Sequence, residues 1–223
     1  MAFSSSNGDS ASWPPHGGRT DRAFRARLSF DDGPGPSTAA LLDVLRDAGC
    51  RATFFLLGGK LSQAPELALR MVCEGHALGN HTWSHALPGG LSDGELIDEI
   101  DATDDLIRRA YRDAGAPEPA AISLRLPYGL APQDARLGVL SRLKRSHTGW
   151  TAILDDWRKP APSAHTLFRA MRRHIHEQTA KGEGALFCLH DSSRHGDARP
   201  QTVEAVRLLL DSVRLETGVG LAD

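Results

Sequence analysis

The chain has 223 residues, of which 40% are hydrophobic and 24% are charged, values typical of one soluble globular domain. Its 26 basic and 28 acidic residues nearly balance, so the charge gives no reason to expect nucleic acid or an anionic membrane as a partner. The sequence also lacks an apolar run of about 18 residues, the length that a transmembrane helix needs. Its three cysteines are far apart and form no Cys-x-x-Cys pair, so we expect reduced core residues.

The N-terminal segment differs in composition from the rest of the chain. Residues 1–21 are rich in Ser, Gly and Pro, which predicts a disordered tail, with a single domain over residues 22–223. The tail contains no apolar run typical of a secretory signal, so we expect a cytoplasmic protein.

Short β-type runs alternate with helical periodicity along the domain. Leu41, Leu42, Leu45 and Ala48, for example, have helical spacing and are followed by a stop at Gly49. The predicted elements are, in chain order, strand 24–30, helix 37–49, strand 52–57, helix 64–74, strand 77–80, helix 92–114, strand 122–124, helix 133–146, strand 148–154, helix 164–179, strand 185–189 and helix 202–216. Such alternation indicates parallel βα units, hence an α/β barrel or a doubly wound sheet.

Residues with catalytic or metal-binding chemistry follow most of the predicted strands. They are Asp31-Asp32, His81 and His85, Arg125, Asp155-Asp156 and His190-Asp191. The loops after the strands of a βα barrel line one face, so these side chains are expected to meet there. Polar residues are common in loops, and position alone does not identify a site.

The segment His81-Thr82-Trp83-Ser84-His85 places two imidazoles at positions i and i+4. On a helical turn they would share one face, which suits two ligands of one metal ion. The alternative is a pair of unrelated surface histidines at the start of a helix. Asp32 could supply an oxygen ligand, and a set of two histidines and one aspartate leaves positions open for water and substrate.

Two adjacent carboxylates, Asp31 and Asp32, directly follow the first predicted strand. Asp-Asp-Gly-Pro is also good turn chemistry, which is the structural explanation for the pair. The functional hypothesis divides their work: Asp32 binds the metal, and Asp31 faces a water held by the metal and acts as its general base.

Five segments, in order along residues 24–215, resemble the motifs of the polysaccharide deacetylase (NodB-like) family. They are Ser29-Phe30-Asp31-Asp32-Gly33-Pro34, the run from Glu74 through Asn80 to His85, Arg125-Leu126-Pro127-Tyr128-Gly129, Asp156-Trp157 and Leu189-His190-Asp191. The resemblance implies a deformed, incomplete (β/α) barrel and a metal-dependent hydrolase that removes an N-acetyl group from a sugar.

The resemblance also implies roles for individual residues around the metal. Asp32, His81 and His85 would bind it, and Asp31 would be the base. Arg125 would keep Asp31 ionised and oriented, as a nearby cation should.

Three further residues would complete the reaction according to the same resemblance. The backbone N–H of Tyr128 would stabilise the oxyanion. His190 would be the acid that protonates the departing amine, and Asp156 would orient and charge His190.

The resemblance implies that Trp157, Cys188 and Leu189 lie at the substrate, together with Tyr128. Trp157 and Trp83 would line the sugar site, although core packing explains either tryptophan equally well. The chain departs from the family pattern at three positions, where Ile153 replaces an Asp, Leu126 a Pro and Cys188 a Leu. The last of these normally lines the acetyl pocket, so that pocket is expected to differ.

The expected cofactor is a divalent metal, with Zn²⁺ the first choice for this ligand set and Co²⁺, Ni²⁺ or Mn²⁺ alternatives. The expected partner is an N-acetylated carbohydrate, and a small soluble N-acetylglucosamine oligomer or an N-acetylated biosynthetic sugar fits the short chain better than an insoluble polymer. An O-acetyl esterase of the xylan type and a silent carbohydrate-binding protein are the alternatives. The oligomeric state is left open.

Overall fold

Five parallel strands form the central sheet, in the order β3-β2-β1-β5-β4. The computed structural model describes residues 26–217, so the predicted tail over residues 1–21 and the first residues of the first predicted strand lie outside the described residues. The strands are β1 (Ala26–Gly33), β2 (Thr53–Leu56), β3 (Ala77–Asn80), β4 (Ala152–Ile153) and β5 (Ala185–His190).

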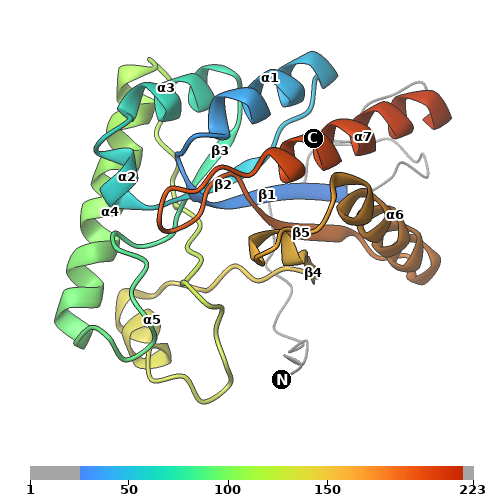
Figure 1. The fold of residues 1–223 in the computed structure, drawn as a ribbon. Helices are drawn as coiled ribbons and strands as arrows, with labels where there is room; N and C mark the ends of the chain where they lie inside the picture. The colour runs from blue at the N-terminus through green and yellow to red at the C-terminus, as the bar shows by residue number, and fades with distance from the viewer. Residues whose placement is uncertain (1–25, 218–223) are drawn as a thin grey trace.

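Helices cover the outside of the sheet, and each long helix lies beside the helices that follow the neighbouring strands (Figure 1). They are α1 (Thr38–Ala48), α2 (Gly58–Leu61), α3 (Pro65–Cys73), α4 (Asp93–Asp113), α5 (Leu137–Leu143), α6 (Ala164–Lys181) and α7 (Pro200–Thr217), with a 3₁₀ turn over Asp155–Trp157. The sequence signals at the helix ends are confirmed: α1 ends at Gly49 in the left-handed conformation, and Ser92 and Glu95 form a capping box at the start of α4.

The wall of the barrel continues beyond β3 through single residues. Leu124 forms isolated parallel bridges with Asn80 on one side and with His147 on the other, and the chain then runs from His147 to β4. The predicted deformed, incomplete barrel is therefore confirmed. The predicted strand over 122–124 is wrong for Ile122 and Ser123: in this segment only Leu124 forms bridges, and the carbonyl of Ile122 accepts a hydrogen bond from Arg145 instead.

The strands alternate between an apolar outer face and a polar inner face. Outward side chains such as Leu28, Phe30 and Phe187 join the large apolar core beneath the helices. The inner face carries Ser29 and Asp31, and it is crossed by the guanidinium group of Arg125. The functional residues therefore lie inside the barrel, on the side of the strands away from the main core.

Some predicted elements are shorter in the structure, and one was not predicted. Helix α5 and strand β4 cover only part of the ranges 133–146 and 148–154. The carbonyls of Thr148 and Gly149 accept hydrogen bonds from Arg125 and are not free for a strand ladder. Helix α2 has one turn, too short to produce a periodic signal.

The three cysteines form no disulfide, as predicted, but only two are buried. Cys50 and Cys188 lie in the interior, whereas Cys73 is exposed at the end of α3. The prediction of a core position is therefore wrong for Cys73, which lies on the solvent side of its helix.

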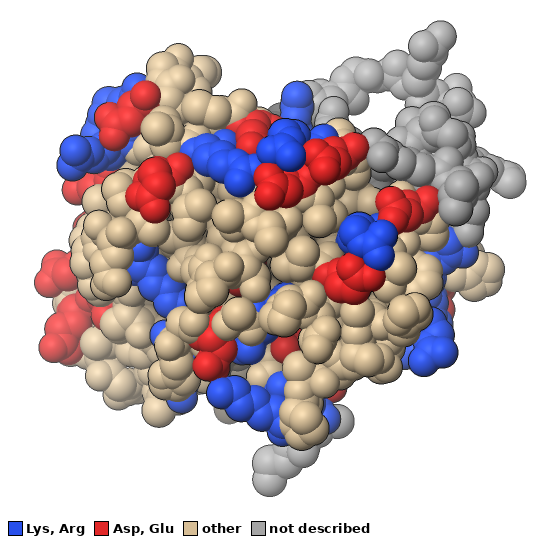
Figure 2. All heavy atoms as spheres, turned by 45° about the horizontal axis from the view of Figure 1, so that its top comes forward, with Lys and Arg blue, Asp and Glu red and all other residues tan. Residues whose placement is uncertain are grey.

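No helix within residues 26–217 has the length and apolar character needed to cross a membrane. On the face shown in Figure 2, acidic and basic side chains are interspersed, with no large field of one sign. This distribution agrees with the near balance of charge in the sequence.

Candidate active site

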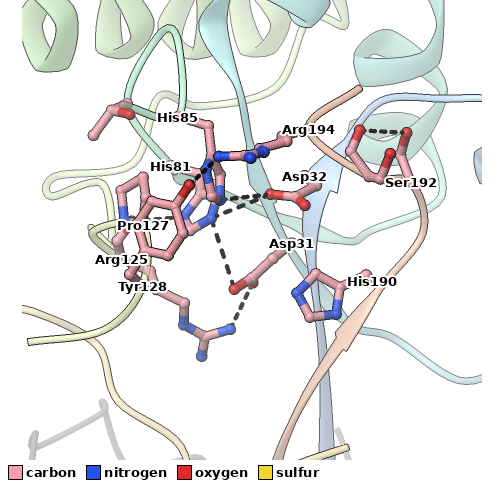
Figure 3. Close-up of polar contacts among 12 residues, drawn as sticks. Asp31, Asp32, His81, His85, Arg125, Pro127, Tyr128, His190, Ser192 and Arg194 are labelled. Carbon is pink, nitrogen blue, oxygen red and sulfur yellow. Dashed lines mark hydrogen bonds and ion pairs between the residues drawn. The ribbon is translucent and has the colours of Figure 1, made fainter. Parts of the chain in front are cut away.

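A β-bulge at the end of β1 brings two adjacent carboxylates to one site. The register between β1 and β2 slips between Asp31 and Gly33, and Asp32 has a φ of 70°. In a regular strand the side chains of Asp31 and Asp32 would point to opposite faces, but the extra residue of the bulge redirects Asp32. Figure 3 shows the carboxylate of Asp32 directed toward two imidazoles and that of Asp31 toward one of the two.

The two imidazoles belong to a loop that follows β3 and precedes α4. Thr82 and His85 both have positive φ values, 66° and 57°, so the predicted helical turn is wrong. The carboxylate of Glu99 on α4 instead accepts the backbone N–H groups of Trp83 and Ser84, each at 3.0 Å. A side chain from a distant helix thus stabilises a loop at the position where the sequence predicted a helical turn.

The side chains of Asp32, His81 and His85 converge on one point. Oδ1 of Asp32 lies 3.5 Å from Nε2 of His81 and 3.2 Å from Nε2 of His85. This oxygen is buried and has no hydrogen-bond partner of good geometry among the described residues. Burial raises the pKa of Asp32, but the two imidazoles lower it more, and the net pKa is well below the ordinary value.

A backbone carbonyl fixes the orientation of the His81 ring through the nitrogen that faces away from Asp32. Nδ1 of His81 lies 2.7 Å from the carbonyl oxygen of Arg125. Since a carbonyl only accepts, Nδ1 carries the proton and Nε2 presents its lone pair to Asp32. Two imidazole nitrogens and one unpartnered carboxylate oxygen fit a divalent metal ion.

Asp31 forms a buried ion pair with Arg125. Nη1 of Arg125 donates to Oδ1 of Asp31 at 2.7 Å and to Oγ of Ser29 at 2.8 Å, and the guanidinium group lies 4.0 Å from the centre of the Phe55 ring. Burial acts to raise the pKa of Asp31, but the charges of Arg125, His81 and His190 together outweigh burial, so this pKa lies below its ordinary value. Asp31 is therefore ionised at neutral pH.

His190 faces the same site from the neighbouring strand β5. It pairs with Asp31 in the register of the sheet, so the two side chains lie side by side (Figure 3). Asp156 holds it by two contacts of 2.8 Å, one with the backbone N–H and one with Nδ1, and Asp156 itself accepts from the hydroxyl of Thr202 at 2.8 Å. Burial lowers the pKa of His190, but Asp156, together with smaller contributions from Asp32 and Asp31, outweighs burial and raises this pKa to about 9.

Tyr128 lies at the rim of the site, with its ring against His85. The ring centres are 4.8 Å apart, and the Tyr128 hydroxyl accepts a hydrogen bond from Arg194 (Figure 3). The backbone has a φ of 65°, and its N–H has no acceptor among the described residues. This N–H is available to a bound ligand.

The two tryptophans differ in their surroundings. Trp157 is 48% exposed beside Asp156 and does not pack in the core. Trp83 packs against Gly58 and Gly59, where an added Cβ at Gly58 would lie 2.5 Å from the indole ring. The packing explanation therefore holds for Trp83 and not for Trp157.

Cys188 and Leu189 are both buried but point to opposite sides of β5. Sγ of Cys188 donates to Oδ2 of Asp31 at 3.3 Å. Leu189 belongs to the apolar core beneath the helices, so the structure does not bring its side chain to the site.

The structure adds Lys60, which no sequence pattern indicated, and shows the surroundings of Asp191, the last residue of the fifth motif. Nζ of Lys60 donates to the backbone carbonyl of Asp32 at 2.7 Å, and this hydrogen bond stabilises the bulge. The carboxylate of Asp191 lies under Gly33, where an added Cβ would be 2.5 Å from Oδ2. Burial raises the pKa of Asp191 to about 7, and the Thr38 hydroxyl donates to this carboxylate.

The sequence pattern of the polysaccharide deacetylase family matches residues 18–143, more than half of the chain. The chain belongs to this family. A chitooligosaccharide deacetylase from Bradyrhizobium sp. (strain ANU 289) is 31% identical over 198 residues, which cover 84% of this chain and 83% of the relative.

Solved structures of the polysaccharide deacetylase type agree with this assignment. The peptidoglycan deacetylase PdaC from Bacillus subtilis is 29% identical with a TM-score of 0.69, covering 91% of this chain and 89% of that one. A family 4 carbohydrate esterase from Streptomyces lividans in complex with acetate is 27% identical with a TM-score of 0.67, covering 89% and 91%. The predicted family and fold class are both confirmed.

Proposed function

We propose that this polysaccharide deacetylase hydrolyses the N-acetyl group of an N-acetylglucosamine-type sugar in a metal-dependent reaction. The observation that carries the proposal is the buried, ionised carboxylate of Asp31, which lies between a metal-ligand set and a charged imidazole. Such a site places a base, an acid and a cation around one small volume.

Asp32, His81 and His85 would hold the metal. Zinc is our first expectation, because it commonly takes histidine and carboxylate ligands with an open position, while Co²⁺, Ni²⁺ and Mn²⁺ also suit these donors. When bound, a divalent metal polarises the acetyl carbonyl and lowers the pKa of a water in the site.

Asp31 accepts a proton from the attacking water through Oδ2, since Oδ1 is held by Arg125. The free backbone N–H of Tyr128 donates to the oxygen on which negative charge develops. His190 then gives its proton to the sugar nitrogen as the carbon–nitrogen bond breaks, and the products are acetate and a free amine.

Asp156 keeps His190 in its acidic form. With a pKa raised to about 9, the imidazole is protonated at neutral pH and can donate. After proton transfer, Asp156 accepts the remaining Nδ1–H and holds the ring in place.

We infer a soluble chitooligosaccharide as the substrate, because the deacetylase of that name matches most of both chains. Trp157, exposed beside Asp156, offers a flat apolar surface on which a sugar ring would stack. The cytoplasmic location stays a prediction of the sequence.

The proposal is tested by acetate release from chitooligosaccharides, N-acetylated monosaccharides and acetylated xylan, with and without a chelator. Chelator-sensitive release from an N-acetyl sugar is the expected result. Release from xylan alone would replace the proposal with an O-acetyl esterase, and no release from a metal-loaded protein would favour a binding role.

Two variants separate the metal ligands from the base. Asp31→Asn should abolish turnover while the protein still binds one equivalent of metal, and His81→Ala should lose the metal. His176→Ala, an exposed histidine on α6, is the matched control and should keep both metal and activity. An active Asp31→Asn enzyme would refute the assigned base.

A further inference from the structure

The thiol of Cys188 lies against the proposed base. Cys188 pairs with Ser29 in the sheet register, two residues before His190, so its side chain points to the same inner face as Asp31. Its Sγ is 3.3 Å from Oδ2 of Asp31. The family motif usually has a leucine at this position, and a leucine offers no donor atom to the site.

Three potential ligand atoms meet at this point, separate from the Asp32 set. A carboxylate oxygen of Asp31, Sγ of Cys188 and a ring nitrogen of His190 all lie within 4.8 Å of one another. Oδ1 of Asp31 is occupied by Arg125 and Nδ1 of His190 by Asp156. The atoms left to bind an ion are therefore Oδ2, Sγ and Nε2, of which Sγ and Oδ2 are bonded to each other in the absence of an ion.

We propose that Asp31, Cys188 and His190 form a second metal site, which takes a thiophilic divalent ion such as Zn²⁺ or Cd²⁺. Ligands bound tetrahedrally at about 2.0–2.3 Å lie roughly 3.4–3.8 Å apart, so the three side chains need to move by only about 1 Å. Thiolate and imidazole ligands favour zinc and its heavier analogue over magnesium or calcium.

The second site is weaker than the Asp32 site because two of its ligands, the thiol of Cys188 and the imidazole of His190, are protonated at neutral pH. Burial and the charge of Asp31 raise the pKa of Cys188 well above its ordinary value. The incoming ion displaces two protons to solvent, one from the thiol and one from Nε2 of His190, and bonds to the thiolate and the ring nitrogen, and nothing is oxidised. The site therefore fills only when metal is present in excess.

Filling this site inhibits the enzyme, a consequence that rests on the proposed function. Oδ2 of Asp31 and Nε2 of His190 become metal ligands, so the base and the acid are lost together. One equivalent of zinc should therefore activate the enzyme, and excess zinc should inhibit it.

The site is tested by titrating Cd²⁺ into protein that already holds one equivalent of metal and following the ultraviolet absorption of cadmium–thiolate bonds. The ligand set around Asp32 contains no sulfur and gives no such absorption. Cys188→Leu removes the ligand with the residue usual in the family, and Cys188→Ala is the second variant. Cys73→Ser, at an exposed thiol, is the matched control.

The wild type and Cys73→Ser should show a thiolate band that saturates at one Cd²⁺ per chain, and both Cys188 variants should lack it. Loss of even a supporting group of a metal site lowers affinity by about 10–100-fold, so loss of a ligand should cost at least that much. A band that persists in the Cys188 variants, or no band in the wild type, would overturn the proposal.

Activity provides a second measurement. Each protein is compared with its own rate at one equivalent of zinc. The excess zinc that halves the wild-type rate should leave the Cys188→Leu rate nearly unchanged, whereas equal inhibition of both proteins contradicts the proposal. The cadmium titration does not depend on turnover, so it decides the site even if the proposed deacetylation fails.

Discussion

Asp156→Asn isolates the charge that keeps His190 acidic. The substitution keeps the size of the side chain and an oxygen acceptor, but it removes the negative charge 2.8 Å from Nδ1. Burial lowers the pKa of His190, and Asp156 is the largest of the carboxylates that raise it, so without this charge the pKa should fall from about 9 toward the ordinary value of 6.5. The alkaline limb of the activity profile should therefore move to lower pH.

The size of the effect follows from the protonated fraction of His190. At pH 8 a group with a pKa of about 9 is about 90% protonated, whereas a group with a pKa of about 6.5 is only about 3% protonated. The rate at pH 8 should then fall roughly 30-fold, and below pH 6 the two proteins should differ far less.

The assay is acetate release at saturating substrate from pH 5 to pH 10. The matched control is Asp155→Asn, a neighbouring carboxylate that is exposed and paired with Arg158. Its profile should coincide with that of the wild type. An Asp156→Asn enzyme with an unshifted alkaline limb would show that another group is the acid.

Three further substitutions test the packing around the site. Arg125→Met leaves the carboxylate of Asp31 buried without its cation and should cost about 3–5 kcal/mol of unfolding free energy, measured by urea titration. Thr202→Val removes the hydroxyl bonded to Asp156 at 2.8 Å and should cost about 1.5–3 kcal/mol without loss of metal, whereas an unchanged midpoint contradicts the role. Gly33→Ala places a Cβ 2.5 Å from the carboxylate beneath it and should lower stability by about 1–3 kcal/mol, detected as a lower melting temperature; wild-type stability would mean that the carboxylate moves freely.

The sequence predicts which residues meet, because parallel strands end at one edge of the sheet. Asp31 and His190 lie on strands predicted from apolar runs, and the register of β1 with β5 places them side by side. Arg125 follows a segment predicted as a strand, and a single bridge at Leu124 is enough to position it. Motif order and strand ends together therefore indicate the site without any knowledge of its geometry.

The local backbone of the ligands could not be predicted in the same way. The spacing of His81 and His85 is helical, yet Glu99 from α4 captures the N–H groups that a helical turn would leave free. The bulge at Asp32 depends on Lys60, whose ammonium group binds a carbonyl at 2.7 Å. Both contacts join residues far apart in the chain, and the spacing of apolar residues in the sequence does not predict such contacts.

The gap in the barrel and the ionisation of Asp31 have one physical cause. Arg125 is fully buried, and four of its five N–H groups donate to Thr148, Gly149, Ser29 and Asp31. A buried guanidinium group is tolerated only when its donors are satisfied, so the carbonyls of residues 148 and 149 turn toward it and cannot pair as a strand. The wall between β3 and β4 therefore stays irregular where a complete barrel would have a strand, and the same guanidinium group keeps Asp31 charged. A lysine could not make these four contacts, because an ammonium group has three donors and no planar fork.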